Sequence, residues 1–181
     1  MNNNRRYALY YTAILAELVG GAGRVTAIEF DPALAARAAA NFAQAAQVRV
    51  VTGDRTRIPF DPADVVYVNA GATRAADCWL DGLREGGRLV LPLTAGGFPP
   101  TERPRGAVFR IERRGEEFLA RRISGVVIFP CEGARDEASE QALAAAFDEG
   151  GVERVTRLYR RDDLAEEDCW LRAPGWCLAY R

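Results

Sequence analysis

The sequence predicts an α/β fold in which strands and helices alternate around a parallel, doubly wound sheet. Two apolar runs, Val25–Glu29 and Val48–Thr52, are short and rich in β-branched residues, and an alanine-rich stretch of helical length separates them. Glycine and proline mark turns between the runs. A chain of 181 residues that is 49% hydrophobic can bury one sizeable core, so we expect a single domain.

The first half of the chain carries a local signal for each element. Residues 10–19 have the apolar spacing of a helix, and the glycines of residues 20–23 end it. Asp31 and Pro32 start the next helix, because aspartate caps a helix N-terminus and proline suits its first position. In order, we expect a helix over 10–19, a strand over Val25–Glu29, a helix from 32 to about 45, and strands over Val48–Thr52 and 64–68, the last of them buried.

The second half begins with a helix over 75–83 and a strand over 88–92. Residues 94–105 are rich in glycine and proline and form either a loop that closes over a ligand or a plain surface connection. After them we expect strands over 107–113 and 118–129 paired as an antiparallel hairpin at the edge of the sheet, a helix over 136–149, a strand near 152–158 and a final segment over 176–180. Residues 1–130 would form the sheet domain, with 131–181 as an extension packed on it.

Composition argues against several classes of function. The net charge of −1 gives no broad attraction to nucleic acid or to an anionic membrane. No apolar run is long enough to cross a bilayer and no secretory cleavage pattern follows the polar start, so we expect a cytoplasmic protein. The cysteines form no Cys-x-x-Cys pair, and we expect buried thiols at Cys78, Cys131, Cys169 and Cys177.

Histidine and lysine are both absent. Their absence excludes histidine-based triads, histidine-ligated zinc, Schiff-base chemistry and the phosphate-loop lysine, and we expect no metal. Catalysis would rest on carboxylates, hydroxyls, tyrosine, cysteine, arginine or backbone groups. A reaction that needs no strong general base therefore fits best.

Two strands end in acidic residues, Glu29 and Asp54. Because the carboxyl ends of parallel strands line the ligand crevice of such a sheet, a carboxylate there is well placed to bond ribose hydroxyls. This pattern favours a nucleotide-like cofactor. The glycines of residues 20–23 follow a helix and precede a strand, the reverse of the order that a phosphate-binding loop needs, so we interpret them as a turn.

Four segments, in their order and spacing, resemble the successive motifs of class I S-adenosylmethionine-dependent methyltransferases, and in particular those of protein-L-isoaspartate O-methyltransferases. They are Tyr-Tyr-Thr-Ala-Ile-Leu-Ala at 10–16, Gly-Arg-Val-Thr-Ala-Ile-Glu at 23–29, Thr-Gly-Asp at 52–54 and Glu-Gly-Gly-Arg-Leu-Val-Leu-Pro at 85–92. The resemblance covers about residues 9–130. It implies a Rossmann-like fold and S-adenosylmethionine as cofactor.

The resemblance also implies roles for residues at the first two strand ends. Glu29 would accept hydrogen bonds from both ribose hydroxyls, and Phe30 would pack beside the adenine. Asp54 would accept from the adenine amino group, with Gly53 giving the base room. The alternatives are that Glu29 is a solvated acid near a helix start, a role that suits Asp31 better, and that Gly53 and Asp54 only form a turn.

Further site residues follow from the same resemblance. Asn69, with Ala70 and Gly71, would face the methionine part of the cofactor and the methyl acceptor. The alternative is that Asn69 closes a turn by bonding its own backbone. Tyr10 and Tyr11 match residues that follow the family's glycine loop, where the backbone approaches the cofactor. Alternatively, both rings pack a helix against the sheet.

The sequence departs from the family at its start, where the first central strand and the glycine loop are missing or degenerate. Aligned on Tyr10, the three loop glycines fall at Arg5, Tyr7 and Leu9. The strand before them would lie between the strands over 25–29 and 64–68, and its loss would leave buried ladder groups unpaired at about 1–3 kcal/mol each. Either residues 1–9 form a makeshift strand, the two neighbours close up, another chain supplies a strand in an oligomer, or the sequence is a fragment, which we favour.

The chain also departs from the isoaspartyl pattern after Pro130. The last long helix is preceded by Gly133-Ala134-Arg135-Asp136-Glu137, and two tryptophans, Trp170 and Trp176, lie near the end. These tryptophans either belong to the core, which is usual for large aromatic residues, or form a recognition surface. The methyl acceptor is therefore left open between a protein carboxylate and a small-molecule one.

The resulting expectation is S-adenosylmethionine-dependent O-methylation of a carboxylate. A carboxylate acceptor is already ionised near neutral pH and needs no base, which agrees with a chain that has neither histidine nor lysine. Two alternatives stay open. One is a degenerate, non-catalytic module of the same fold that acts in protein interaction, and the other is a nicotinamide-dependent oxidoreductase, which Glu29 at a strand end would also suit.

Overall fold

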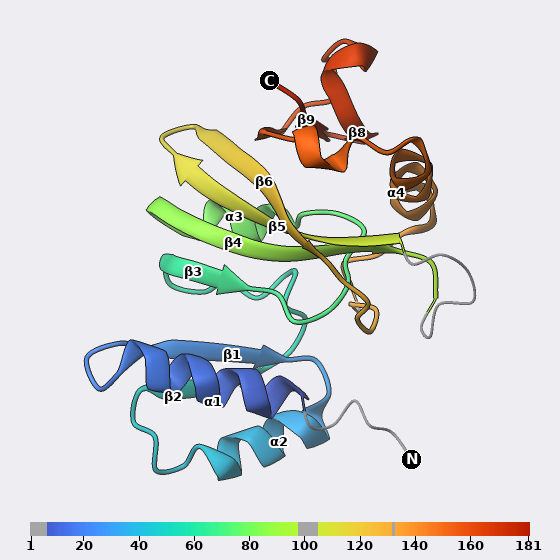
Figure 1. Cartoon of the computed structure of the whole chain (residues 1–181). Coiled ribbons are helices and arrows are strands. Elements are labelled where there is room, and N and C mark those ends of the chain that lie inside the picture. The colour runs from blue at the N-terminus through green and yellow to red at the C-terminus, as the bar shows by residue number, and fades with distance from the viewer. Residues whose placement is uncertain (1–6, 98–104, 132) are drawn as a thin grey trace. The chain divides into compact units, whose positions relative to one another are not determined.

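The computed structural model describes residues 7–97, 105–131 and 133–181 (Figure 1). The chain divides into two compact units, Met1–Phe60 and Asp61–Arg181. The first contains the two strands whose carboxyl ends carry Glu29 and Asp54, and the second contains a larger sheet. The observed mixture of helices and strands confirms the α/β class.

The first unit alternates helix and strand as the sequence predicts. Its elements are α1 (Tyr7–Val19), β1 (Val25–Glu29), α2 (Pro32–Asn41) and β2 (Val48–Thr52). The strands β1 and β2 are parallel, with Val25 opposite Val48 and Glu29 opposite Thr52. The helix α2 packs on both strands through its buried Ala35 and Ala38. The strand bounds agree with the prediction because β-branched runs flanked by turn residues are an unambiguous local signal.

Both ends of α2 have a local cause. Asp31 caps the helix by accepting hydrogen bonds from the N–H groups of Ala33 (2.8 Å) and Leu34 (3.1 Å), and Pro32 occupies its first position. The helix ends at Asn41 rather than near residue 45. The turns that follow join the N–H of Ala45 to the carbonyl of Phe42 and that of Val48 to the carbonyl of Ala45, and they lead the chain directly into β2.

The helix α1 extends further towards the N-terminus than predicted, starting at Tyr7 instead of residue 10. The alternative of a makeshift strand is therefore wrong for residues 7–9, because helix hydrogen bonding has already begun there. Arg5 and the other residues of 1–6 lie outside the described part of the chain. Within the described residues β1 pairs with β2 in a two-stranded sheet, and β3 (Ala63–Tyr67) belongs to the sheet of the second unit.

The second unit is built on a seven-stranded sheet with the order β3-β4-β5-β6-β7-β9-β8. Figure 1 shows β3, β4, β5 and β6 of this sheet in succession. Only β3 and β4 are parallel in this sheet, so it is far more antiparallel than the predicted doubly wound sheet with one edge hairpin. The long hairpin of β5 and β6 turns at Gly115 as predicted and continues the sheet into the C-terminal strands. Besides β3, the strands are β4 (Leu83–Ala95), β5 (Arg105–Arg114), β6 (Glu117–Gly125), β7 (Arg157–Tyr159), β8 (Cys169–Ala173) and β9 (Trp176–Ala179).

The helices of this unit are α3 (Asp77–Asp81), which packs on β4, and α4 (Glu137–Glu149), which packs on β4, β5 and β8. The described part of this unit also includes short 3₁₀ turns at Val152–Arg154 and Glu166–Asp168. The first of these lies where the sequence predicts a strand, because only the end of the 152–158 segment pairs with β6.

The core of the second unit lies between the sheet and α4. Leu91, Phe109 and Leu143 are fully buried. The ring of Trp170 lies 5.6 Å from that of Phe109 and 5.2 Å from that of Phe147. Trp79, Trp170 and Trp176 are all buried, which confirms the interpretation of the tryptophans as core residues.

Two expectations for this unit are wrong. The strand over 64–68 is not buried along its length, since Val65 and Tyr67 are 38% and 37% exposed and only Val68 is buried; among the described residues β3 is the edge of its sheet and pairs with β4 alone. The four cysteines are not all thiols, because Cys169 and Cys177 form a disulfide across β8 and β9, with Cα atoms 6.2 Å apart. Cys131 is buried as expected. Among the described residues no helix is both long and apolar enough to cross a membrane.

Asp136 offers a test of the second unit. Its carboxylate caps α4 by accepting from the N–H (2.8 Å) and the hydroxyl (2.7 Å) of Ser139, and these bonds hold the pKa of Asp136 below its usual range. We expect Asp136→Ala to lower the free energy of unfolding by about 1 kcal/mol. Urea unfolding followed by tryptophan fluorescence measures this unit alone, because all three tryptophans lie in it.

Because the pKa of Asp136 is lowered by folding, its contribution is fully present at neutral pH and is lost as the pH falls through that lowered value. The difference between wild type and Asp136→Ala should therefore shrink in acid. Glu137→Ala, which removes an adjacent exposed acid that accepts a hydrogen bond from the Gln141 side chain, is the matched control and should change stability much less. A loss equal to that of Asp136→Ala would contradict the assignment of the cap.

Candidate functional site

The acidic residues at the ends of β1 and β2 come together at one edge of the first unit. The two strands run in parallel, and Glu29 is opposite Thr52 in the register. Beyond the last pair, the N–H of Gly53 donates to the carbonyl of Glu29 at 2.8 Å. Glu29, Phe30, Gly53 and Asp54 thus form a contiguous group at the carboxyl end of the sheet, as the sequence predicts.

Glu29 is half-buried and has one oxygen engaged. Its Oε1 accepts from the N–H of Asp31 at 3.1 Å, and its Oε2 has no hydrogen bond to any described residue. The capping role belongs to Asp31, so Glu29 is not itself the helix cap. Phe30 lies beside it with an exposed ring. A carboxylate oxygen and an aromatic face are therefore available together at the strand end.

Gly53 and Asp54 form a tight turn that fixes the second carboxylate. Gly53 has φ of +150°, and a side chain there would overlap Ile58. The Oδ1 of Asp54 accepts from the N–H (2.8 Å) and hydroxyl (2.7 Å) of Thr56, and Arg57 lies 3.5 Å from Oδ2. The hydrogen bonds from Thr56, with the nearby Arg57 charge, lower the pKa of Asp54, so it is ionised at neutral pH. Gly53 and Asp54 do form the turn that the sequence analysis gives as the alternative to a binding role. This turn also orients the carboxylate of Asp54.

The predicted tyrosines lie on α1. Tyr10 is largely exposed, and its ring makes an edge contact with that of Tyr11 at 5.5 Å between centroids. The first turn of α1 occupies the positions of Tyr7 and Leu9, two of the three positions where the family has loop glycines. The backbone there is helical, so the described residues do not reproduce the tight glycine turn.

The predicted residues of the second unit follow β3. The N–H of Val68 donates to the carbonyl of Val90, which extends the β3–β4 pairing to the start of Asn69-Ala70-Gly71. Asn69 is half-buried, and its side chain has no hydrogen bond within the described residues, so the turn-closing bond considered for it is not observed. Ala70 and Gly71 are buried.

Sequence reasoning missed the residues that hold this segment. The buried Thr73 donates its N–H to the carbonyl of Ala134 (3.0 Å), and Arg135 donates to the carbonyl of Gly71 at 2.9 Å. The run Gly133-Ala134-Arg135 stands out in the sequence, because it departs from the family pattern after Pro130. No local rule, however, connects it with residues more than 60 positions earlier in the chain.

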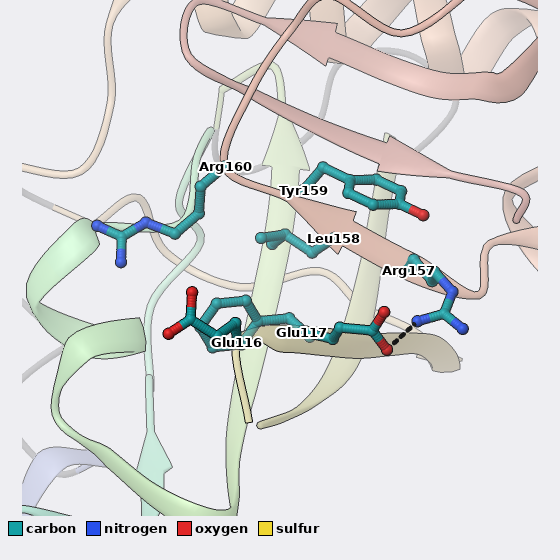
Figure 2. A pocket seen from close by; sticks show the side chains of 7 residues that line it. Glu116, Glu117, Arg157, Leu158, Tyr159 and Arg160 are labelled. Atoms are coloured by element: carbon teal, nitrogen blue, oxygen red, sulfur yellow. Dashed lines mark hydrogen bonds and ion pairs between the residues drawn. The ribbon is translucent and has the colours of Figure 1, made fainter. Parts of the chain in front are cut away.

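A small cavity of about 170 Å³ lies elsewhere in the second unit, between residues 116–118 and 157–160 (Figure 2). Three of its charged side chains, Glu117, Arg157 and Arg160, are engaged in ion pairs. Arg157 pairs with Glu117 at 2.7 Å, and Arg160 pairs with Asp77 at 2.9 Å and with Asp81. These hydrogen bonds raise the pKa of both arginines. The cavity is smaller than typical cofactor pockets of about 300–1,000 Å³, and none of the predicted site residues lines it.

A family model for protein-L-isoaspartate(D-aspartate) O-methyltransferases matches residues 8–131, which include both strand ends of the first unit and the segment after β3. The chain belongs to the protein-L-isoaspartate O-methyltransferase family. This family uses S-adenosylmethionine as its methyl donor. The nicotinamide oxidoreductase and non-catalytic alternatives therefore gain no support, and the resemblance on which the sequence interpretation rests is confirmed.

Individual members of the family show the extent of the similarity. The chain is 37% identical over 89 residues to protein-L-isoaspartate O-methyltransferase of Methanopyrus kandleri and 38% identical over 88 residues to that of Ignicoccus hospitalis. Each match covers 46% of this chain, and the chain spans 39% and 42% of these relatives. The relative from Korarchaeum cryptofilum is 28% identical over 136 residues, which is 68% of this chain and 59% of the relative.

A solved structure of a protein-L-isoaspartate O-methyltransferase shows the same fold. It superposes with a TM-score of 0.59 at 21% identity and covers 77% of this chain and 42% of its own. The Rossmann-like methyltransferase class predicted from the sequence is confirmed at the level of the fold.

Gly53 provides a test of the local geometry of the site. We expect Gly53→Ala to lower the free energy of unfolding of the first unit by about 1–3 kcal/mol, because a side chain at Gly53 would overlap Ile58 and would need an unfavourable φ. Urea unfolding followed by far-ultraviolet circular dichroism measures the effect. Gly21→Ala is the matched control, since nothing lies within 4 Å of a side chain there and its φ is not positive. Equal stability losses in the two variants would contradict the prediction.

Proposed function

We propose that this chain binds S-adenosylmethionine and serves methyl transfer to a carboxylate of the isoaspartyl type. The observation that carries the proposal is the adjacency of Glu29 and Asp54 at the ends of β1 and β2, fixed by the hydrogen bond from Gly53 to Glu29. Two carboxylates and an exposed aromatic ring at one strand edge suit the adenosine part of the cofactor. The same residues lie inside the range matched by the family model.

Each side chain has a distinct part in the proposed binding. The Oε2 of Glu29 is available to ribose hydroxyls, and Phe30 offers its ring to the adenine face. The carboxylate of Asp54 is held in one orientation by Thr56, and it would accept from the adenine amino group next to Gly53. These groups fit the adenosine half of the cofactor in chemistry, since both carboxylates are acceptors and the ligand groups are donors.

The remaining predicted residues would serve the reacting half. Asn69 and Ala70 would face the methionine part and the acceptor, and Tyr10 would lie where the chain approaches the cofactor. When bound, S-adenosylmethionine supplies a methyl group on a positively charged sulfur atom. The protein's task is then to orient donor and acceptor, which is the main source of rate in such a transfer.

The composition agrees with a carboxylate acceptor. An isoaspartyl or other carboxyl group is ionised near neutral pH, so no histidine or lysine base is needed. The identity of the acceptor stays open between a protein and a small molecule. We keep as predictions a cytoplasmic location, the absence of nucleic-acid binding, and residues 131–181 as an extension of the sheet domain. An oligomer in which another chain completes the sheet also stays a prediction.

The cofactor proposal is tested by calorimetric titration with S-adenosylhomocysteine, the demethylated product. We expect Glu29→Gln to weaken binding at least about tenfold, because a charge-assisted hydrogen bond contributes about 1.5–3 kcal/mol. Glu17→Gln is the matched control, since Glu17 is an exposed acid of α1 away from the strand ends, and it should bind like wild type. Absence of heat with the wild-type chain at millimolar ligand would overturn the proposal.

The acceptor proposal is tested with tritium-labelled S-adenosylmethionine and a matched pair of peptides that differ only in one isoaspartyl or aspartyl residue. We expect base-labile label, the signature of a methyl ester, on the isoaspartyl peptide. Equal labelling of both peptides would exclude isoaspartyl selectivity, and cofactor binding without labelling of either would overturn the proposed transfer to an isoaspartyl-type carboxylate.

A further inference from the structure

Arg135 lies immediately before α4 and is largely buried, with only 15% of its side chain exposed. Its Nη1 donates to the carbonyl of Gly71 (2.9 Å) and to both the carbonyl (3.1 Å) and the hydroxyl (3.0 Å) of Thr94. Its Nη2 donates to the carbonyl of Gly96 (3.3 Å) and lies 3.0 Å from a carboxylate oxygen of Glu140. One guanidinium therefore joins the segment after β3 to the end of β4.

Glu140 completes this arrangement from the first turns of α4. Its Oε2 pairs with Arg135, while its Oε1 accepts from the N–H of Gly96 at 3.0 Å. The ion pair neutralises the buried guanidinium, and the two side chains hold Gly96 through both its N–H and its carbonyl. A charge this buried is stable only when it is paired and hydrogen-bonded in this way.

The segment that Arg135 holds is fitted tightly. The N–H of Gly71 donates to the carbonyl of Phe129 (2.7 Å), and the carbonyl of Gly71 also accepts from the N–H of Cys131 (2.8 Å). On the other side, the N–H of Ala72 donates to the carbonyl of Pro92 at 3.0 Å. A side chain at Gly71 would overlap that of Thr94. Such close packing transmits a shift of the guanidinium to the backbone of residues 69–72.

We propose that Arg135 is a positioning residue for methyl transfer, which holds Asn69 and Ala70 in place through the carbonyl of Gly71. The inference rests on the proposed function, because it takes Asn69 and Ala70 to face the reacting half of the cofactor. Arg135 acts on the backbone of this segment through its hydrogen bonds to Gly71, Thr94 and Gly96, all of which belong to the second unit. Its planar fork of donors reaches several acceptors at once, which a lysine ammonium does not match in geometry.

The variant Arg135→Lys keeps the charge and removes the fork. We expect kcat for labelled methyl transfer to fall at least about tenfold, since small misplacements of reacting groups are costly in rate. The Kd for S-adenosylhomocysteine should change less than about threefold, because the proposed adenosine-binding residues belong to the first unit, while Arg135 and the groups it bonds belong to the second. If Arg135 had only a structural role, the substitution would lower stability without reducing kcat selectively while the Kd stays nearly unchanged.

Arg105 supplies the matched control. It joins the start of β5 to the end of α4 through two hydrogen bonds to Asp148, at 2.8 and 2.9 Å, and its side chain is 27% exposed. Arg105→Lys therefore removes a comparable arginine bridge to the same helix without touching Gly71. We expect its kcat to stay within about twofold of wild type.

Hydrogen exchange measured by mass spectrometry tests the positioning independently of activity. In Arg135→Lys the peptide covering residues 69–73 should exchange faster, while the β5–β6 hairpin keeps its protection. Arg105→Lys should leave the 69–73 peptide unchanged. If Arg135→Lys fails to fold, Glu140→Gln loses the ion pair but keeps the hydrogen bonds from Arg135 to Gly71 and Thr94, and it should show the same kcat effect in weaker form.

The outcomes separate the two proposals. A wild-type chain that transfers no methyl group overturns the proposed function, and the catalytic role of Arg135 with it. An active wild type with unchanged kcat in Arg135→Lys overturns the positioning role alone. A loss of kcat that Arg105→Lys shares, or unchanged exchange of residues 69–73, also overturns it.

Discussion

Backbone hydrogen bonds formed just beyond the ends of parallel strands determine where the candidate site residues lie in both units. In the first unit the N–H of Gly53 bonds the carbonyl of Glu29, and in the second the N–H of Ala72 bonds the carbonyl of Pro92. An unpaired backbone group in such a partly buried place would cost about 1–3 kcal/mol. Each bond restricts the backbone next to it. The positions of the two carboxylates and of the segment after β3 are therefore set mainly by the main chain.

Much of the fold was predictable because its signals are local. The bounds of β1 and β2 follow from short β-branched runs, and the starts of α2 and α4 follow from Asp31 and Asp136 as caps. The placement of Glu29 and Asp54 at one edge of the sheet also follows, since it needs only two neighbouring parallel strands joined by a helix.

Features that depend on distant partners were not predictable in this way. The exposure of β3 depends on whether another strand pairs with the edge that faces away from β4, and the residues of β3 do not indicate this. The disulfide requires β8, a strand that the sequence signals only weakly beside Pro174 and Gly175. Arg135 and Gly71 are 64 residues apart, and their contact arises only when α4 packs against the end of β4.

Arginine is the only basic side chain available to fix loop ends in this protein. Arg135 bonds the carbonyls of Gly71 and Thr94, and Arg113 bonds those of Leu83 and Gly115 in the same manner. A guanidinium keeps its proton up to pH values of about 12, well above the range in which lysine loses its charge. The connections between strands and loops are therefore insensitive to alkaline conditions, under which a protein held together by lysine would begin to lose them.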